Sequence, residues 1–117
     1  MAAFHAKATT FLYTKAMIKN KFNMRAKVWL YPAQHAAWHF ITLPKKQSGE
    51  ITKRFGLLKR GWGSLPVVVT MGDTSWRTSI FPDKKQGAYL LPLKAEVRKK
   101  EKIKAGDMVL FSLEVRV

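Results

Sequence analysis

Hydrophobic and polar residues alternate strictly along two segments, one near each end of the chain. In residues 22–31 the apolar positions are Phe22, Met24, Ala26, Val28 and Leu30. In residues 108–117 they are Val109, Phe111, Leu113, Val115 and Val117. Successive side chains of a β-strand point to opposite faces, so each pattern predicts a strand with one buried face.

Four further strands are expected between these two segments. They are rich in β-branched and aromatic residues and cover residues 38–43, 65–71, 75–81 and 88–93. Gly72 and Asp73 separate two of them, and a Gly-Asp pair is typical of a two-residue hairpin turn.

Two short helices interrupt the strands. Ser48 is expected to be the N-cap of the first, which runs to about Gly61 with Ile51, Phe55 and Leu58 on its apolar face. The second helix is expected over residues 94–101. About six or seven short strands and two helices predict a mainly β fold, with the sheet closed into a small barrel, because closure removes exposed strand edges.

The charge of the chain is strongly one-sided. Of 117 residues, 22 are Lys or Arg and 7 are Asp or Glu, which gives a formal net charge of +15. Both halves are basic, so the whole surface is expected to attract polyanions. The chain has no Cys, which fits a reducing compartment, and we expect a cytoplasmic protein. No apolar run reaches the roughly 20 residues needed to cross a bilayer.

Residues 1–21 differ from the rest of the chain. They mix apolar and basic residues without a period, and Lys15 interrupts the apolar run that a secretory signal would need. We interpret them as a basic extension, with Met17 and Met24 as alternative starts of the protein. Residues 22–117 are expected to form a single barrel domain.

Four motifs, in order along the chain, resemble a known family. They are AWHFITLP at residues 37–44, VVVTMGDTSWRTSIFP at 67–82, GAYLLPLKAEVRK at 87–99 and GDMV at 106–109. From about residue 22 onward the chain resembles the bacterial family called domain of unknown function number nineteen-hundred-five. The resemblance implies a small closed β-barrel with two short helices. It implies no established activity, and residues 1–21 lie outside it.

The residue inventory gives little support to enzyme chemistry. The chain has no glycine-rich phosphate loop, no Gly-x-Ser-x-Gly elbow and no His-Glu-x-x-His zinc pair. His35 and His39 share a strand face without a third type of metal ligand nearby. Asp73, Asp83 and Asp107 fall in predicted turns, where such side chains bond local backbone amides. We therefore expect a binding protein with no catalytic residues, metal or cofactor.

One group of residues suits a small anion. Arg77 and Ser79 share a face of the strand over residues 75–81, and Lys94 and Arg98 stand four apart on the second helix. An Arg offers a planar fork of donors to a phosphate or carboxylate, and Ser79 adds a hydroxyl. The leading hypothesis is that these four residues converge on an anion site at a barrel mouth. The alternative is an ordinary solvated helix face.

A second hypothesis is a basic barrel that binds nucleic acid non-specifically. Its candidate residues are Lys53, Arg54, Lys59, Arg60 and Trp62. Bases stack on exposed aromatic rings that are flanked by cations. The alternative is that Trp62 simply packs against the first helix.

The four tryptophans are expected in two environments. Trp29 and Trp62 are expected to be partly exposed, the first on the polar face of its strand and the second between two glycines. Trp38 and Trp76 are expected in the core.

Overall fold

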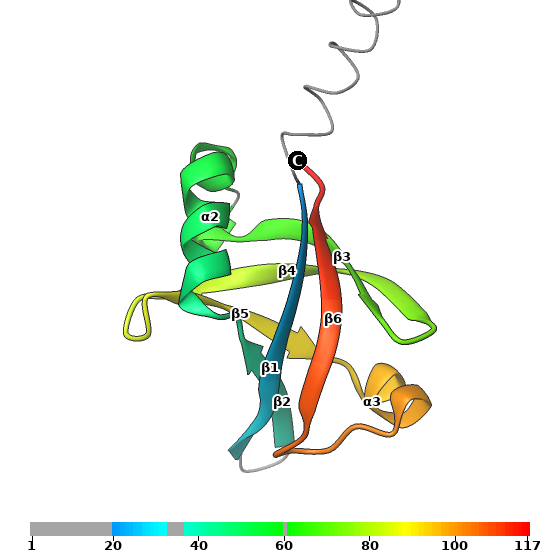
Figure 1. The fold of residues 1–117 in the computed structure, drawn as a ribbon. Coiled ribbons are helices and arrows are strands. Elements are labelled where there is room, and N and C mark those ends of the chain that lie inside the picture. The colour runs from blue at the N-terminus through cyan, green and yellow to red at the C-terminus, as the bar shows by residue number, and fades with distance from the viewer. Residues whose placement is uncertain (1–19, 33–36, 60) are drawn as a thin grey trace, which may run out of the picture.

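Six antiparallel strands form a closed barrel in the computed structural model, which describes residues 20–32, 37–59 and 61–117 (Figure 1). The strands are β1 (Lys21–Pro32), β2 (Ala37–Thr42), β3 (Leu65–Met71), β4 (Thr74–Asp83), β5 (Ala88–Leu93) and β6 (Met108–Val115). Around the barrel their order is β1-β2-β5-β4-β3-β6. The predicted closed barrel with two short helices is confirmed. Residues 1–19 of the predicted extension lie outside the described residues.

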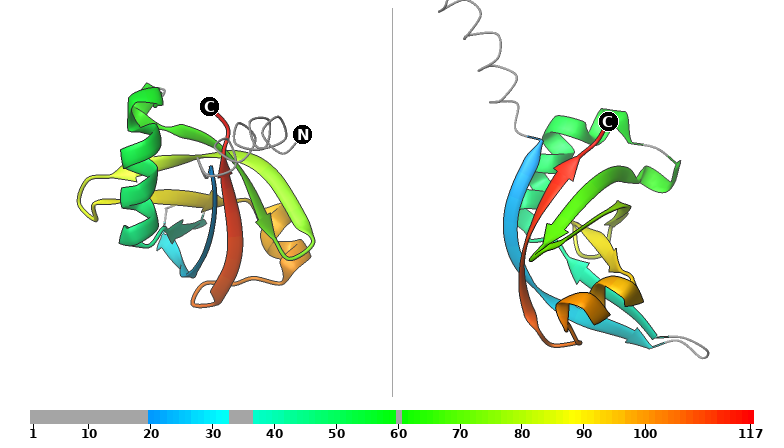
Figure 2. Two further views of the ribbon diagram at one scale, coloured as in Figure 1. Left: turned by 45° about the horizontal axis from the view of Figure 1, so that its top comes forward. Right: turned by 90° about the vertical axis from the view of Figure 1, so that its right-hand side faces the viewer.

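Strands β1 and β4 close the barrel because each belongs to two sheets, pairing in one sheet along its first part and in the other along its last part. β1 pairs with β6 over residues 21–27 and with β2 over residues 28–32. β4 pairs with β3 over residues 74–80 and with β5 over residues 81–83. Figure 2 shows the long curve that β1 follows from one neighbour to the other. Two sheets that share these strands leave no edge unpaired.

The apolar row of each strand fills the barrel. On β6 the buried residues are Val109, Phe111, Leu113 and Val115, and on β3 they are Leu65, Val67, Val69 and Met71. The predicted alternation is confirmed along β6 and along β1 as far as Val28. The prediction is wrong for Leu30, which lies two residues before the end of β1 and is 43% exposed.

Helix α2 (Lys45–Phe55) packs on the barrel, and its start differs from the prediction. Pro44 is the N-cap, and Ser48 lies inside the helix with its side chain buried. The Ser48 hydroxyl accepts the backbone N–H of Tyr89 at 3.1 Å and donates to the carbonyl of Leu43 at 3.4 Å. The prediction of Ser48 as an N-cap is therefore wrong, because its hydroxyl holds α2 against β5. The predicted helix end near Gly61 is also wrong, because α2 ends at Phe55 and Leu58 is 54% exposed in the 3-10 turn η1 (Gly56–Leu58). A second 3-10 turn, η2 (Gly61–Gly63), then leads to β3.

Helix α3 (Ala95–Glu101) lies across the barrel from α2 (Figure 1). It is held beside the β3–β4 hairpin, where the hydroxyl of Thr74 donates to Glu101 Oε2 at 2.6 Å. Met71 pairs with Thr74, which confirms the predicted two-residue turn. Gly72 takes a φ of 58° in that turn, a conformation that glycine adopts without strain.

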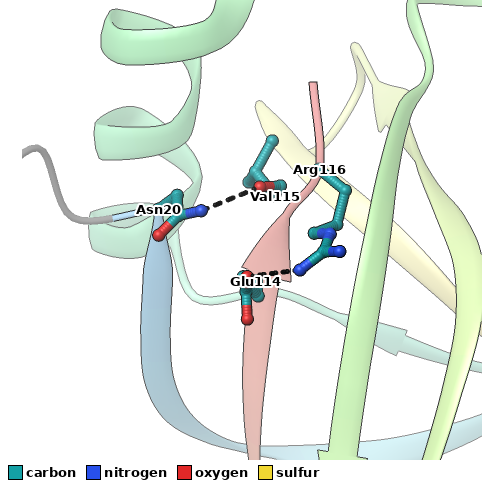
Figure 3. Close-up of polar contacts among 4 residues, drawn as sticks. All are labelled: Asn20, Glu114, Val115 and Arg116. Carbon is teal, nitrogen blue, oxygen red and sulfur yellow. Dashed lines mark hydrogen bonds and ion pairs between the residues drawn. The ribbon is translucent and has the colours of Figure 1, made fainter. Parts of the chain in front are cut away.

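Figure 3 shows where the start of β1 meets the end of β6. Asn20 Nδ2 donates to the carbonyl of Val115 at 3.3 Å, and the backbone N–H of Val115 donates to the carbonyl of Asn20 at 2.7 Å. Arg116 pairs with Glu114 at 2.9 Å. Solvent-exposed ion pairs contribute little, so the bonds between Asn20 and Val115 are what extend the β1–β6 seam.

Candidate functional site

An open groove lined by aromatic rings lies along β1, β2 and β5. Its volume is about 690 Å³, and its lining residues are Trp29, Tyr31, Trp38, Phe40, Pro82, Asp83, Lys84, Lys85 and Leu90. We call it the aromatic groove. Its rings come from β1 and β2, and its lysines come from the loop between β4 and β5.

Strand pairing brings the four rings together. The β1–β2 register sets Trp29 opposite Phe40 and Tyr31 opposite Trp38. Residues opposite one another in a sheet project from the same face. Val28, which alternates with these rings on β1, is fully buried in the core. The rings therefore form a patch on the outer surface of the barrel.

Trp29 anchors this patch. Its Nε1 donates to Thr42 Oγ1 at 2.9 Å. Its ring centroid lies 5.2 Å from that of Phe40 and 6.5 Å from that of Tyr31, the second pair nearly edge-on at 65°. These separations fall within the range of about 4.5–7 Å that is typical of favourable aromatic pairs. Three rings thus hold one another in place.

Two rings of the aromatic groove face solvent. Tyr31 is 57% exposed and Trp38 is 55% exposed. The prediction of Trp38 in the core is therefore wrong. Ile41 lies on the inward row of β2, and Trp38, three residues away, projects from the opposite face. Large apolar groups exposed side by side are typical of a binding surface.

Charged groups border the aromatic groove on one side. Lys84 and Lys85 are both exposed. Asp83 Oδ1 accepts the backbone N–H of Lys85 at 3.1 Å, which is the turn role that the sequence predicts for this residue. Asp107 accepts the backbone N–H of Lys104 at 3.0 Å in the same way. The border therefore offers two cations, while its carboxylate is engaged by its own loop.

A second depression, which we call the α2 hollow, adjoins the aromatic groove. Its volume is about 870 Å³, and its lining residues are Thr52, Gly56, Leu57, Lys59, Gly63, Pro82, Asp83, Lys84, Gly87, Ala88 and Tyr89. Pro82, Asp83 and Lys84 line both depressions. The two depressions therefore adjoin at the end of the β4–β5 hairpin.

A protein-family model described as "Domain of unknown function (DUF1905)" matches residues 24–113. The chain belongs to the DUF1905 family. The resemblance that the four sequence motifs indicate is thereby confirmed. All residues that line the aromatic groove and the α2 hollow fall within the matched range. No curated protein matches the chain.

Two negative findings apply to residues 20–32, 37–59 and 61–117 of the DUF1905 domain. Within these ranges, no three His, Asp or Glu side chains are grouped closely enough to hold a metal ion. None of the helices described there has the length and apolar character needed to span a membrane.

The predicted anion residues of the DUF1905 domain come from β4 and α3. Arg77 is exposed and Ser79 is half-buried, and both lie on the row of β4 that faces away from the core, as predicted. Lys94 is exposed at the N-cap of α3. Arg98 is half-buried, and its Nε donates to the carbonyl of Leu93 at 3.4 Å. Convergence of the four residues on one anion stays a prediction.

The residues of the predicted nucleic-acid strip are described in part. Lys53 is exposed on α2, and Lys59 is exposed after η1, where it lines the α2 hollow. Arg60 and the side chain of Trp62 lie outside the described part of the structure. Base stacking on Trp62 stays a prediction.

Arg54, the remaining member of that strip, contacts other parts of the domain. Its guanidinium pairs with Glu50 at 3.2 Å and lies 6.0 Å from the centroid of the Phe22 ring. A pair of this kind on an exposed helix contributes roughly 0.3–0.5 kcal/mol. Arg54 therefore takes part in the contact between α2 and the start of β1.

The sequence patterns do not by themselves predict the aromatic groove. A period of two places Trp29 with Tyr31 on β1 and Trp38 with Phe40 on β2. The register that joins the two pairs is a tertiary property. Two aromatic-x-aromatic triplets on either side of a short connection are the one sequence signal that indicates such a patch.

His39 lies in a cationic environment near α3. It pairs with Leu93 across β2 and β5, and Arg98 contacts the carbonyl of that leucine. Burial lowers the pKa of the His39 imidazole, and the charge of Arg98 lowers it further, against a smaller opposing effect of the Ala37 carbonyl. His39 is therefore harder to protonate in the folded domain than in the unfolded chain.

We expect the stability of the DUF1905 domain to fall as the pH drops below about 6.5, the ordinary pKa of histidine. The unfolded chain then binds a proton at His39 that the folded domain resists, and the loss ends once the pH is below the lowered folded pKa. Thermal melts at several pH values measure this loss. His39→Gln, which leaves the other two histidines in place, should show a shallower fall. An equal fall in both proteins would contradict the prediction.

Proposed function

We propose that this DUF1905 domain is a binding module for a small anionic ligand that carries a flat ring, and that it is not an enzyme. The observation that carries the proposal is the aromatic groove, where an exposed Trp38 lies in the same depression as Lys84 and Lys85. A nucleoside monophosphate is the simplest ligand with both features.

The chemistry of the aromatic groove supports a ligand of this kind. Its volume of about 690 Å³ lies in the range of roughly 300–1,000 Å³ that small-molecule sites occupy. Stacking on an exposed aromatic ring stabilises a bound base by about 1–3 kcal/mol. A hydrogen bond from a lysine to a phosphate contributes about 1.5–3 kcal/mol. The net charge of +15 raises the local concentration of anions further.

The described side chains of the aromatic groove support binding more than catalysis. Among them, Asp83 is the one carboxylate, and it accepts a hydrogen bond within its own turn. The other lining residues are aromatic, apolar or lysine. Nucleophilic catalysis needs a nucleophile and a base within hydrogen-bond reach, and this set of residues supplies no such pair.

We expect the double charge reversal Lys84→Glu, Lys85→Glu to weaken the binding of thymidine monophosphate by about tenfold or more, because it replaces two attractive contacts with repulsion. Quenching of tryptophan fluorescence or isothermal titration calorimetry measures the affinity. Lys45→Glu, Lys46→Glu is the matched control. It makes the same change in net charge at two consecutive, exposed residues of α2, and neither of them lines either depression.

Two results would contradict the proposal. Equal losses in the two double variants would mean that only the overall charge attracts the nucleotide. Loss of binding in Arg77→Ala, with binding retained in the Lys84→Glu, Lys85→Glu variant, would place the anion at the alternative set of Arg77, Ser79, Lys94 and Arg98.

A further inference from the structure

We propose that the aromatic groove and the α2 hollow together form one track for single-stranded nucleic acid, which crosses the end of the β4–β5 hairpin. This inference rests on the proposed function, in which the aromatic groove holds one nucleotide, and extends the ligand to a strand of linked nucleotides. Its distinct content is that the α2 hollow binds the nucleotides next to the one in the groove.

The first argument is that the two depressions adjoin. Pro82, Asp83 and Lys84 line both of them, so the end of the β4–β5 hairpin is a wall that the aromatic groove and the α2 hollow share. Figure 1 shows the β4–β5 loop projecting from the barrel on the side of α2. The volumes of about 690 and 870 Å³ are each large enough for a small ligand. A flexible chain can occupy both at once.

The second argument is how the chemistry changes along the track. The aromatic groove presents rings, with Trp38 and Tyr31 more than half exposed. The α2 hollow presents Lys59, and Lys84 lines both depressions. Single-strand sites combine aromatic platforms for the bases with cations along the backbone. A duplex keeps its bases stacked on one another and leaves none for Trp38 or Tyr31.

The third argument is that η2 and β4 pack closely against each other where they line the α2 hollow. Gly63 has a φ of 75°, and a Cβ there would lie 2.9 Å from Pro82 Cγ. η2 therefore packs directly against the hairpin, and the hollow has walls from both segments. Gly87 also lines the hollow, and a Cβ there would have no heavy atom within 4 Å, so the space beside it is open.

The fourth argument is electrostatic. Asp83 is the one acidic side chain among the described residues that line the track. Its carboxylate accepts a hydrogen bond from the backbone of Lys85, which offsets part of its repulsion of a phosphate. Glu50, an acidic residue of the neighbouring helix α2, is paired with Arg54. The surface along the track is therefore cationic.

The test uses the full chain with fluorescein-labelled oligothymidylates of about 4, 8 and 12 nucleotides, and thymidine monophosphate as the short probe. Fluorescence anisotropy gives the affinities. We expect the affinity to rise with length until the track is filled. We also expect a log-log salt slope of about −0.7 for each phosphate contact. A duplex of the same length should bind more weakly than the single strand.

Lys59→Glu should weaken binding of the longer oligothymidylates by about threefold to tenfold and leave the affinity for thymidine monophosphate within about twofold. Lys99→Glu is the matched control, because Lys99 is exposed on α3, across the barrel from the track (Figure 1). It makes the same change in net charge and should leave both affinities nearly unchanged. Both substitutions are at exposed sites, and circular dichroism melts verify that the variants are folded.

Four outcomes would overturn the track. Thymidine monophosphate could bind while longer strands bind no more tightly, in which case the proposed function survives and the track does not. A duplex could bind as well as the single strand, or Lys59→Glu and Lys99→Glu could weaken binding equally, and either result would show diffuse attraction by charge. Failure of every probe, thymidine monophosphate included, would overturn the proposed function as well.

Discussion

Leu113→Ala is expected to lower the free energy of unfolding by about 2–5 kcal/mol, because it leaves a cavity where the barrel core cannot collapse. Leu113 is fully buried on β6. Its backbone pairs with Phe22 of β1 on one side and Val69 of β3 on the other. The barrel fixes the positions of these neighbouring strands, so they cannot move inward to fill the cavity that Leu113→Ala leaves. Urea denaturation followed by circular dichroism measures the change.

Leu110→Ala is the matched control for this experiment. It deletes the same atoms from the same strand, but Leu110 is 70% exposed on the outer face of β6. Its free energy of unfolding should stay within about 0.5 kcal/mol of wild type, as is usual at surface sites. Similar losses at the two positions would mean that the inward row of β6 does not form the core, and the barrel described above would be wrong.

Trp38→Ala is expected to weaken binding of thymidine monophosphate by about 5- to 150-fold, since stacking contributes about 1–3 kcal/mol for each base. Stability should change little, because Trp38 is 55% exposed and leaves no cavity when it is shortened. Isothermal titration calorimetry gives the affinity, and a urea melt gives the stability. The combination of a large loss of affinity and a small loss of stability is the signature of a binding residue.

Trp76→Phe serves as the control for the loss of a tryptophan. Trp76 is half-buried against the core and does not line the aromatic groove. Its replacement should leave the affinity for thymidine monophosphate within about twofold of wild type. Retention of full affinity by Trp38→Ala would show that the nucleotide binds elsewhere, and the aromatic groove would lose its proposed role.

The strands of this DUF1905 domain could be predicted because their signal is local. A residue such as Phe111 is buried on β6 and its neighbour Leu110 is exposed, so a period of two in the sequence reports the face directly. The turn at Gly72 and Asp73 could be predicted for the same reason. Its requirement for a positive φ, which Gly72 meets, involves only the residues of the turn itself.

Two wrong predictions concern residues whose partners are distant in sequence. Ser48 has the chemistry of an N-cap, but its hydroxyl is hydrogen-bonded to Tyr89, and the helix starts earlier. Trp38 has the size and apolar character of a core residue, yet it lies on the outer row of β2. Residue type is a weak guide at such positions, because a tertiary contact outweighs local preference.

The amino-acid sequence alone determined the approximate positions of the strands and of the two α-helices, most of the apolar rows and the basic composition, since each of these depends on neighbouring residues or on composition. Only the tertiary structure decided which strands are neighbours. That choice set Trp29 against Phe40, and it brought the aromatic groove and the α2 hollow together at Lys84, which lines both. The physical reason is that strand register and loop position follow from packing the whole barrel at once, and no single segment contains that information.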